Sequence, residues 1–550
     1  MPSNNASSIP ESQVIPKAQE NPWYIQHFTR LLIGFGLGGG AIALVLPWML
    51  WLFCGMSSGS SDQLRLHLLY VTGGVIAVLT LLQTNWKNQG DRIKIDADIK
   101  KNEQDAEKNE RDHIRQVHAE RRSRYTKAVE QLADEKAAVR LGGIYTLVGL
   151  VDEWLADETL DPEEQQKEGQ VIINNLCSYS RSPFPLAEKI DEYEARQELK
   201  ELESKKPDTL LPDESSKLDT LRKRFEDSAE YQEPDNIAAL QAAFHEEQDV
   251  RRAIFEEMSK RSSKVSMGKN KKVTVTPGTW STFGFDFSRA PIFYPLNNLT
   301  IEQGNFVSAR FYGEADFGGA KFAGAADFRD AKFAGAADFR DAKFAGAADF
   351  GGAEFTGLAY FDYAEFAGGH AEFDEAADFN NAKFTGNANF ENAMFAGDAD
   401  FDGAKFAGAA YFGEAEFAGT ADFDGAKFAR AAGFGNATFT ENAYFSSAEF
   451  TEDAYFRGAK FSGKTSFEEA YFEKCAPIFA DASNSARFSA QVDPQDYLFE
   501  EHPESPHGFS CGTAKLLNRT FVLPFGAVLY DPDSWDEEKQ DYTRVSEPAQ

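Results

Sequence analysis

The residue types that most often carry chemistry, histidine, cysteine and paired carboxylates, are dispersed along this chain. The nearest approach to a metal-ligand set is His502, His507 and Cys511, whose side chains could in principle coordinate a metal. Pro503 and Pro506 interrupt this segment, and the paired spacing of structural zinc sites is lacking. No Ser, His and Asp set, catalytic carboxylate pair or phosphate loop stands in an intelligible context. The sequence therefore predicts no catalytic, metal or cofactor site, and no enzyme.

A glycine pattern near the N-terminus, Gly34, Gly36 and Gly39, matches the GxGxxG of dinucleotide-binding turns. That motif needs a preceding strand and a following amphipathic helix, and the apolar run that surrounds these glycines predicts neither. Small residues four positions apart instead let membrane helices approach closely. We therefore predict helix packing, either against the second apolar run or against another copy of the same helix, through Gly34, Gly36, Gly38 and Gly40.

Two apolar runs are long enough to cross a membrane. The first extends from Leu31 to Met56 without a charge, and the second from about Leu68 to Thr84. Basic residues collect directly after the second run, whereas the loop between the runs is nearly uncharged. By the positive-inside rule, two transmembrane helices at 31–86 place the N-terminal tail, 1–30, and the large C-terminal portion in the cytoplasm. The expected location is the cell (inner or plasma) membrane, with no removable secretory signal.

The composition argues against direct nucleic-acid binding. The 550-residue chain has 56 Lys and Arg against 88 Asp and Glu, a formal net charge of −32. Phosphate binding needs clustered basic side chains, which this balance opposes. The four cysteines lie in unlike segments without disulfide or zinc spacing, which favours a reducing compartment. The length allows three or so structural units.

The middle of the chain is predicted to be helical. Residues 87–123 are rich in charge and poor in helix breakers, which is typical of a solvent-exposed connecting helix. From residue 124 apolar positions recur at spacings of three and four, and they predict a helical module at 124–265 in which Gly142 and Gly143 separate two short helices. Further expected parts are helices at Val171–Tyr179 and Asn236–Arg261 and, between them, a charged insert at about 187–233 that forms a solvated helical hairpin.

Internal repetition dominates the C-terminal half. Phenylalanines from Phe306 to Phe479 mostly follow one another at alternating steps of five and six residues, and alanine stands two residues before nearly every one. An eleven-residue helical supercoil has a compatible period, but recurring glycines and the lack of a helical apolar stripe argue against it. We predict a solenoid in which each step forms one side of a squarish coil. Its stacked interior is expected to include Phe317, Phe322, Phe328, Phe333, Phe339, Phe344, Phe350, Phe401, Phe406 and Phe412.

This pattern closely resembles the Phe-rich branch of the pentapeptide-repeat family. The resemblance implies a right-handed quadrilateral β-helix, here at 276–489 with its N-terminal cap. Most of the chain resembles a bacterial family of membrane proteins with two N-terminal spans, a small helical module and a pentapeptide-repeat C-terminus. The motifs that carry this second resemblance are AVEQL at 128–132, VRLGGIY at 139–145 and QDVRRAI at 248–254. The charged insert departs from that family.

The repeat also predicts which side chains face outward. A coil of about 22 residues gives roughly eight coils in a rod on the order of 40 Å long. The residue before each Phe points outward, so two opposite sides carry aspartates such as Asp327 and Asp349, and the other two carry Lys and Glu. A seven-residue step from Phe366 to Phe373 is predicted to rotate this pattern, which would place Asp400 on a different side from Asp349.

Outward positions become partly aromatic in the later coils. We expect Tyr411 and Tyr455 on one side, two coils apart. Ordinary exposed tyrosines are the simpler interpretation, and a partner-binding strip is the sharper one. The residues of this predicted interaction surface are Tyr411, Tyr444, Tyr455 and Tyr471.

Both ends of a solenoid need covering. Trp280–Tyr294 is predicted to cover the first coil, and a hairpin at Arg519–Tyr530, turning at Pro524–Gly526, to cover the last. The hairpin belongs to a C-terminal cap and acidic tail at 490–550, of which residues 531–550 are predicted to be disordered.

These features favour a membrane-anchored, non-enzymatic scaffold that presents a rigid rod to an unknown protein partner in the cytoplasm. Two alternatives remain open. Some soluble pentapeptide-repeat proteins are acidic rods that mimic duplex DNA, which implies an action on a topoisomerase or another DNA-binding protein. Domain order alone suggests a membrane sensor. The glycine-rich spans also permit homo-oligomers.

Overall fold

The computed structural model describes residues 21–205, 211–225, 234, 236–267, 273–367 and 375–550, and it divides into two compact units, Met1–His118 and Ala119–Gln550. The first unit is a helical hairpin. Its first arm comprises α1 (Trp23–Gln26), α2 (Phe28–Ile33), a π-helical stretch (Gly34–Gly38) and α3 (Gly39–Cys54), and its second arm is the start of α4 (Ser58–Leu132). Both arms contain stretches long and apolar enough to cross a membrane.

The helix α4 runs unbroken for 75 residues. The expected second span, the connecting helix and the first helix of the module are therefore parts of one element, and the loop before it shrinks to residues 55–57. Its C-terminal end packs on α5 (Ala137–Leu155). Gly142 and Gly143 lie inside α5 and do not interrupt it; a Cβ at Gly143 would lie 2.9 Å from the carbonyl oxygen of Ala128, so this glycine permits a close helix approach.

The remaining helices complete the module. Asp161 caps α6 by accepting from the Glu164 N–H, and Asn236 caps α9 by accepting from the Ala239 N–H. In the charged insert, two helices form the predicted hairpin around Leu202, Leu218 and Leu221. The bounds are α6 (Pro162–Arg181), α7 (Leu186–Ser204), α8 (Pro212–Phe225) and α9 (Ile237–Arg261), followed by the antiparallel strands β1 (Lys264–Met267) and β2 (Val273–Thr276).

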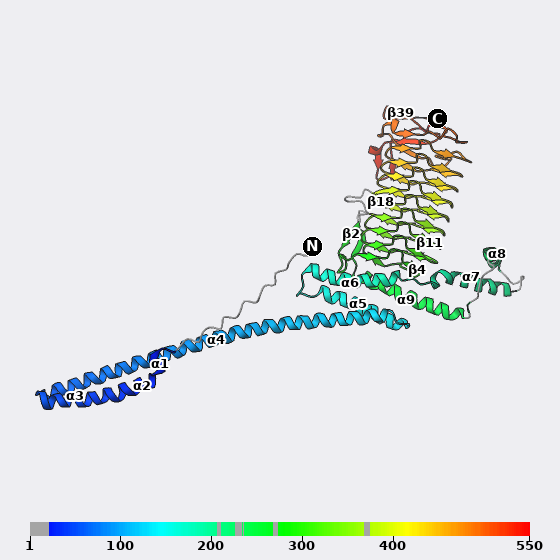
Figure 1. Cartoon of the computed structure of the whole chain (residues 1–550). Coiled ribbons are helices and arrows are strands. Elements are labelled where there is room, and N and C mark those ends of the chain that lie inside the picture. Colours follow the sequence, from blue (N-terminus) through cyan, green and yellow to red (C-terminus); the bar gives the residue numbers. More distant parts are fainter. Residues whose placement is uncertain (1–20, 206–210, 226–233, 235, 268–272, 368–374) are drawn as a thin grey trace, which may run out of the picture. The chain divides into compact units, whose positions relative to one another are not determined.

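From Phe285 the chain winds into a four-sided solenoid (Figure 1). Each side is a parallel sheet of very short strands, one strand per coil, and we number the sides 1 to 4 in chain order. Side 1 consists of β3 (Phe285–Asp286), β6 (Gly304–Asn305), β10 (Ala326–Asp327), β14 (Ala348–Asp349), β18 (Glu375–Asp378), β22 (Asp398–Asp400), β26 (Ala421–Asp422), β30 (Ala443–Tyr444), β34 (Thr465–Ser466) and β37 (Tyr497–Leu498).

Side 2 consists of β4 (Pro291–Ile292), β7 (Arg310–Phe311), β11 (Lys332–Phe333), β15 (Glu354–Phe355), β19 (Lys383–Phe384), β23 (Lys405–Phe406), β27 (Lys427–Phe428), β31 (Glu449–Phe450) and β35 (Tyr471–Phe472). Side 3 consists of β8 (Ala315–Asp316), β12 (Ala337–Asp338), β16 (Ala359–Tyr360), β20 (Ala388–Asn389), β24 (Ala410–Tyr411), β28 (Ala432–Gly433) and β32 (Ala454–Tyr455). Side 4 consists of β5 (Thr300–Ile301), β9 (Lys321–Phe322), β13 (Lys343–Phe344), β17 (Glu365–Phe366), β21 (Met394–Phe395), β25 (Glu416–Phe417), β29 (Thr438–Phe439), β33 (Lys460–Phe461), β36 (Arg487–Ser489) and β40 (Val528–Tyr530).

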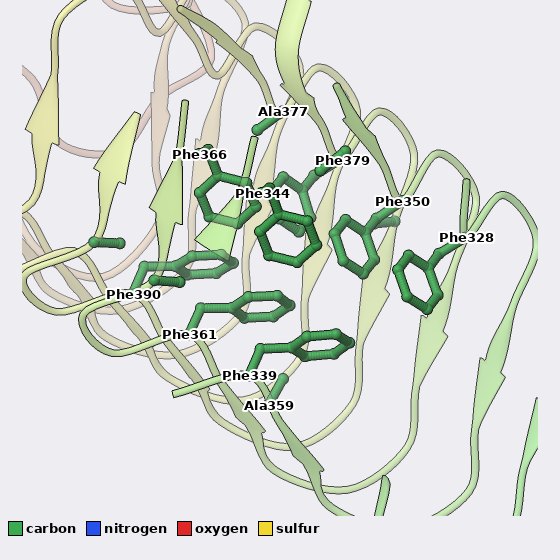
Figure 2. Packing of buried hydrophobic residues seen from close by; sticks show 14 of the residues in the cluster. Phe328, Phe339, Phe344, Phe350, Ala359, Phe361, Phe366, Ala377, Phe379 and Phe390 are labelled. Atoms are coloured by element: carbon green, nitrogen blue, oxygen red, sulfur yellow. The ribbon is translucent and has the colours of Figure 1, made fainter. Parts of the chain in front are cut away.

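The interior is a stack of phenylalanine rings (Figure 2). Rings one coil apart on the same side lie parallel, as Phe328 and Phe350 do with centroids 4.8 Å apart. Rings that follow the strands of the opposite sides 1 and 3 meet edge to face, as Phe350 and Phe339 do at 5.4 Å. The ten interior phenylalanines expected from the sequence are all buried, with at most 1% of each exposed. Burial of rings and alanine methyl groups therefore holds the coils together.

The coils do not rotate at the irregular step, so that prediction is wrong. Asp378 pairs with Asp349 and Asp400 pairs with Asp378, which puts all three on side 1. Phe379 stacks on Phe350 at 4.9 Å, the same contact that regular coils make. Ring stacking thus keeps neighbouring coils in register, although more residues separate Phe350 from Phe379 than separate Phe328 from Phe350. The step through Phe373 itself lies outside the described residues.

The N-terminal end of the solenoid is covered by the helical module. Trp280 and Phe283 are buried, as the predicted cap requires, but Phe285–Asp286 already forms the first strand. Phe255 of α9 stacks on Phe287, which directly follows this strand, with ring centroids 4.3 Å apart. Polar contacts that fix α9 on the first coils run from Gln248 to the Phe293 carbonyl (2.6 Å), from Arg252 to the Pro295 carbonyl (2.7 Å) and from the Thr300 N–H to Ser259 (2.8 Å).

The C-terminal end departs from expectation. The covering hairpin is β38 (Cys511–Leu516) with β39 (Arg519–Pro524), and it turns at Leu517 and Asn518, whose φ angles are 49° and 58°. Pro524–Gly526 instead leads into β40, which continues side 4.

The acidic end is folded and not disordered. Two short 3-10 turns, Pro494–Asp496 and Pro532–Ser534, and a hairpin of β41 (Trp535–Asp536) and β42 (Asp541–Tyr542) pack on the last coils. Tyr542 lies against Tyr530, with ring centroids 4.4 Å apart, and buried Asp531 pairs with Arg544 at 2.9 Å.

Candidate functional site

The rod offers its outward side chains as candidate functional groups. On sides 1 and 3 a two-residue strand places alanine inward and the next residue outward, whereas on sides 2 and 4 the outward residue comes first and phenylalanine follows. Because the strands pair in register, outward residues one coil apart lie directly above one another. Each side of the rod therefore presents a column of side chains with its own chemistry.

Side 1 carries a column of aspartates. Asp327, Asp349, Asp378, Asp400 and Asp422 follow one another in register. Each carboxylate accepts a hydrogen bond from the backbone N–H two residues further on, at 2.7 to 3.2 Å, as in an Asx turn. Burial, with a contribution from neighbouring carboxylates, raises the pKa of Asp349 and of Asp422 to about 6. These aspartates thus shape the corners of the coils as well as charging the surface.

Sides 2 and 4 carry lysine and glutamate, as predicted. On side 2 Glu354 lies between two lysines, with its oxygens 3.0 Å from Lys332 Nζ and 2.8 Å from Lys383 Nζ. On side 4 Lys343 pairs with Glu365 at 2.7 Å. Neighbouring coils therefore neutralise part of each other's charge, and these columns are mixed in sign.

Side 3 carries most of the aromatic outward positions. Tyr411 and Tyr455 lie on this side with Gly433 between them, two coils apart as predicted. The sequence prediction missed Tyr360, which lies on the same side two coils before Tyr411. Tyr444 and Tyr471 instead belong to sides 1 and 2, so the four expected tyrosines do not form one strip.

A family comparison agrees with this geometry. A model described as pentapeptide repeats (9 copies) matches the chain in overlapping stretches between residues 328 and 460. The rod is a pentapeptide-repeat domain. No curated protein and no solved structure matches the chain.

A pentapeptide-repeat domain is a structural repeat fold. Within the described ranges, no three His, Cys, Asp or Glu residues are grouped to hold a metal ion. The His502 ring accepts from the Glu504 N–H at 3.1 Å, and the His507 backbone bridges to Phe472, so both residues take part in the C-terminal cap. Gly34, Gly36 and Gly39 lie in a continuous helical arm, which is not the turn that a dinucleotide site needs.

The glycines of the helical hairpin divide into two groups. A Cβ at Gly39 would lie 2.5 Å from the Thr72 side chain, so Gly39 is a position of close contact between the two arms. Cβ atoms at the four predicted packing positions, Gly34, Gly36, Gly38 and Gly40, would meet nothing within 4 Å in the described chain. Packing of these four against another copy stays a prediction.

Proposed function

We propose that this protein is a membrane-anchored scaffold whose pentapeptide-repeat domain presents fixed columns of side chains to a protein partner. The observation that carries the proposal is the contrast between a uniform core and varied sides. The interior repeats Phe and Ala through nearly every coil, while outward positions differ from side to side. A core of stacked rings holds these columns at fixed spacing, which lowers the entropy cost of recognising an extended partner surface.

Membrane anchoring is supported by the two apolar helices of the hairpin. The basic residues after the second run support a cytoplasmic rod. The module caps the first coils, so a partner that binds the rod is held by one continuous body from Ala119 to Gln550.

Site-specific photocrosslinking in the native cell tests the scaffold role. The full-length protein carries a benzophenone side chain at one outward position per side, replacing Asp400, Lys405, Tyr411 or Glu416 in turn. We expect one side to capture a discrete protein partner that the other three do not. Capture of no protein from any side would refute the proposal.

One observation favours a second candidate, the acidic DNA mimic. The aspartate column of side 1 is continuous from Asp327 to Asp422, because the coils do not rotate. Its carboxylates are engaged in backbone hydrogen bonds, and the adjoining sides carry lysines, both of which weaken a phosphate-like surface. A binding competition between the full-length protein and DNA for a topoisomerase tests this candidate. Competition by the wild type that is lost in the double variant Asp400→Asn, Asp422→Asn would favour mimicry over scaffolding.

A further inference from the structure

Side 3 contains a trough where the strand Ala432–Gly433 has no outward side chain. Gly433 lies between Tyr411 and Tyr455 in the column, and it is the one glycine among the outward strand positions of the described sides. On the same coil the trough is floored by Ala431 and Gly435. A groove of about 400 Å³ opens over this floor.

The fold does not require glycine at either position. Neither Gly433 nor Gly435 has a positive φ angle. A Cβ at Gly433 would lie 3.8 Å from Tyr411 Cδ1, and one at Gly435 would lie 3.7 Å from the Arg457 carbonyl oxygen, both ordinary contacts. By contrast, a Cβ at Gly408 would lie 2.3 Å from the Gly386 carbonyl oxygen. Glycine in a strand is less stable than alanine, and here its presence leaves an open trough.

The walls of the trough are aromatic. Tyr411 is 38% exposed on one side. On the other side the ring of Tyr455 already carries a guanidinium, since Arg457 lies 4.8 Å from its centroid. Asp481 holds Arg457 at 2.7 Å, and the Tyr455 hydroxyl donates to Asp453 at 2.9 Å. With coils about 4.8 Å apart, the two tyrosines leave room for about one planar group between them.

The rim of the trough is acidic. Glu391 and Glu414 line it, and both side chains are exposed. Neither forms an ion pair with any residue that the structure describes. Aromatic faces beside unpaired carboxylates fit a planar cation, because a guanidinium stacks on a ring and pairs with a carboxylate at the same time.

We propose that this trough binds an arginine side chain from a basic segment of a partner protein. The guanidinium lies against Tyr411 and pairs with Glu414, in the way that Arg457 lies against Tyr455 and pairs with Asp481. The net charge of −32 adds a long-range attraction for a basic segment. This inference rests on the scaffold function proposed above and names the chemistry of the partner.

Saturation-transfer NMR tests the trough directly, with the full-length protein in detergent micelles and the peptide acetyl-Gly-Arg-Gly-amide as the probe. Gly433→Tyr fills the trough without changing the net charge. Its matched control is Thr438→Tyr, which adds the same ring to side 4 at the next strand. The comparison peptide has citrulline, an uncharged analogue of arginine, in place of the arginine. We expect the arginine peptide to bind at least fivefold more tightly than the citrulline peptide. Gly433→Tyr should weaken binding of the arginine peptide at least tenfold, whereas the control variant should bind it as the wild type does.

Equal binding of the arginine and citrulline peptides, or unchanged binding in Gly433→Tyr, would overturn the proposal. Circular dichroism checks that both tyrosine variants fold. If Gly433→Tyr does not fold, the exposed substitution Glu414→Gln decides, with an expected loss of threefold or more; unchanged binding there would likewise overturn it. The peptide experiment needs no cellular partner, so its failure is distinguishable from an absence of crosslinks on all four sides, which refutes the scaffold itself.

Discussion

At the scale of single residues, the rod is stabilised by ring burial. Phe401 is fully buried and stacks on Phe379 and Phe423, each with centroids 4.8 Å apart. Phe379 and Phe423 are themselves stacked between further rings, so the cavity left by truncating the Phe401 side chain cannot collapse easily. A single interior phenylalanine therefore supports three coils, while the ends of the rod are less affected.

Phe401→Ala is accordingly expected to destabilise the rod by about 3–5 kcal/mol. Hydrogen exchange followed by mass spectrometry should show the loss of protection concentrated in the coils around residue 401. Lys405→Ala, which changes an exposed outward position one side further on, serves as the control and should leave exchange unchanged. A uniform loss of protection over the entire rod would contradict the nearest-neighbour account of its stability.

The aspartate column makes stability depend on pH. Burial raises the pKa of Asp349 to about 6, above its usual value near 3.8. Between about pH 4 and pH 6 the folded rod therefore holds protons that the unfolded chain has released. The resulting stabilisation is complete below pH 4 and is lost as the pH rises through about 6.

Asp349→Asn should consequently stabilise the protein at pH 7, by about 1 kcal/mol or less because the carboxyl is partly screened by solvent. The amide oxygen can still accept from the Gly351 N–H, so the turn is preserved. Urea denaturation at pH 5 and pH 7 measures the effect. Asp481→Asn is the control of opposite sign, because hydrogen bonds to Ser483 and the Arg457 ion pair lower the pKa of Asp481. If the wild type is more stable at pH 7 than at pH 5, and Asp349→Asn leaves this difference unchanged, the proposed effect of the Asp349 pKa is refuted.

At the scale of elements, the repeat was predictable because its signal is short-ranged. Alternating steps of five and six residues between phenylalanines predict a solenoid with these rings inside, and the resemblance to pentapeptide repeats implies its four sides. The column of Tyr411 and Tyr455 follows in the same way. Spacing could not reveal that the coils stay in register, because the stacking of Phe379 on Phe350, a contact 29 residues apart, overrides the local count.

The ends of the rod were predicted only in part, for a related reason. Residues 531–550 look acidic and disordered locally, yet Arg487 pairs with Asp541 and the ring of Tyr542 lies 4.8 Å from Lys460 Nζ. The N-terminal cap likewise depends on Phe255, which is separated from Phe287 by the whole β1–β2 hairpin. The trough at Gly433 was missed because the signal is an absent side chain, visible only once Tyr411 and Tyr455 are known to flank it.

The helical hairpin allows a matched test of glycine packing. Gly39→Leu should separate α3 from α4, because its Cβ would meet Thr72 at 2.5 Å. Gly40→Leu is the control, since its Cβ meets nothing within 4 Å. Spin labels on the two arms, measured by double electron–electron resonance in lipid nanodiscs, should show a longer distance and a broader distance distribution in Gly39→Leu alone. Equal distances in the Gly39 and Gly40 variants would contradict the assignment of Gly39 as a position of close contact.

A third variant tests self-association. If Gly38→Leu leaves the distance between the arms unchanged but reduces chemical crosslinking between copies, the glycines that do not face the other arm serve self-association.

At the scale of the whole molecule, the compartment of the rod decides which partners can reach it. Lysines and arginines collect after the second apolar run, whereas residues 55–57 between the two helices are uncharged. Moving that cationic segment across the membrane would be unfavourable, so the short loop is expected outside and the rod inside. In a background without native cysteines, Ser57→Cys should react with a membrane-impermeant maleimide in intact cells. Lys405→Cys, on the rod, should react only after the membrane is permeabilised. The reverse pattern would place the rod outside the cytoplasm, and a basic segment recognised at Tyr411 would then have to come from an external protein.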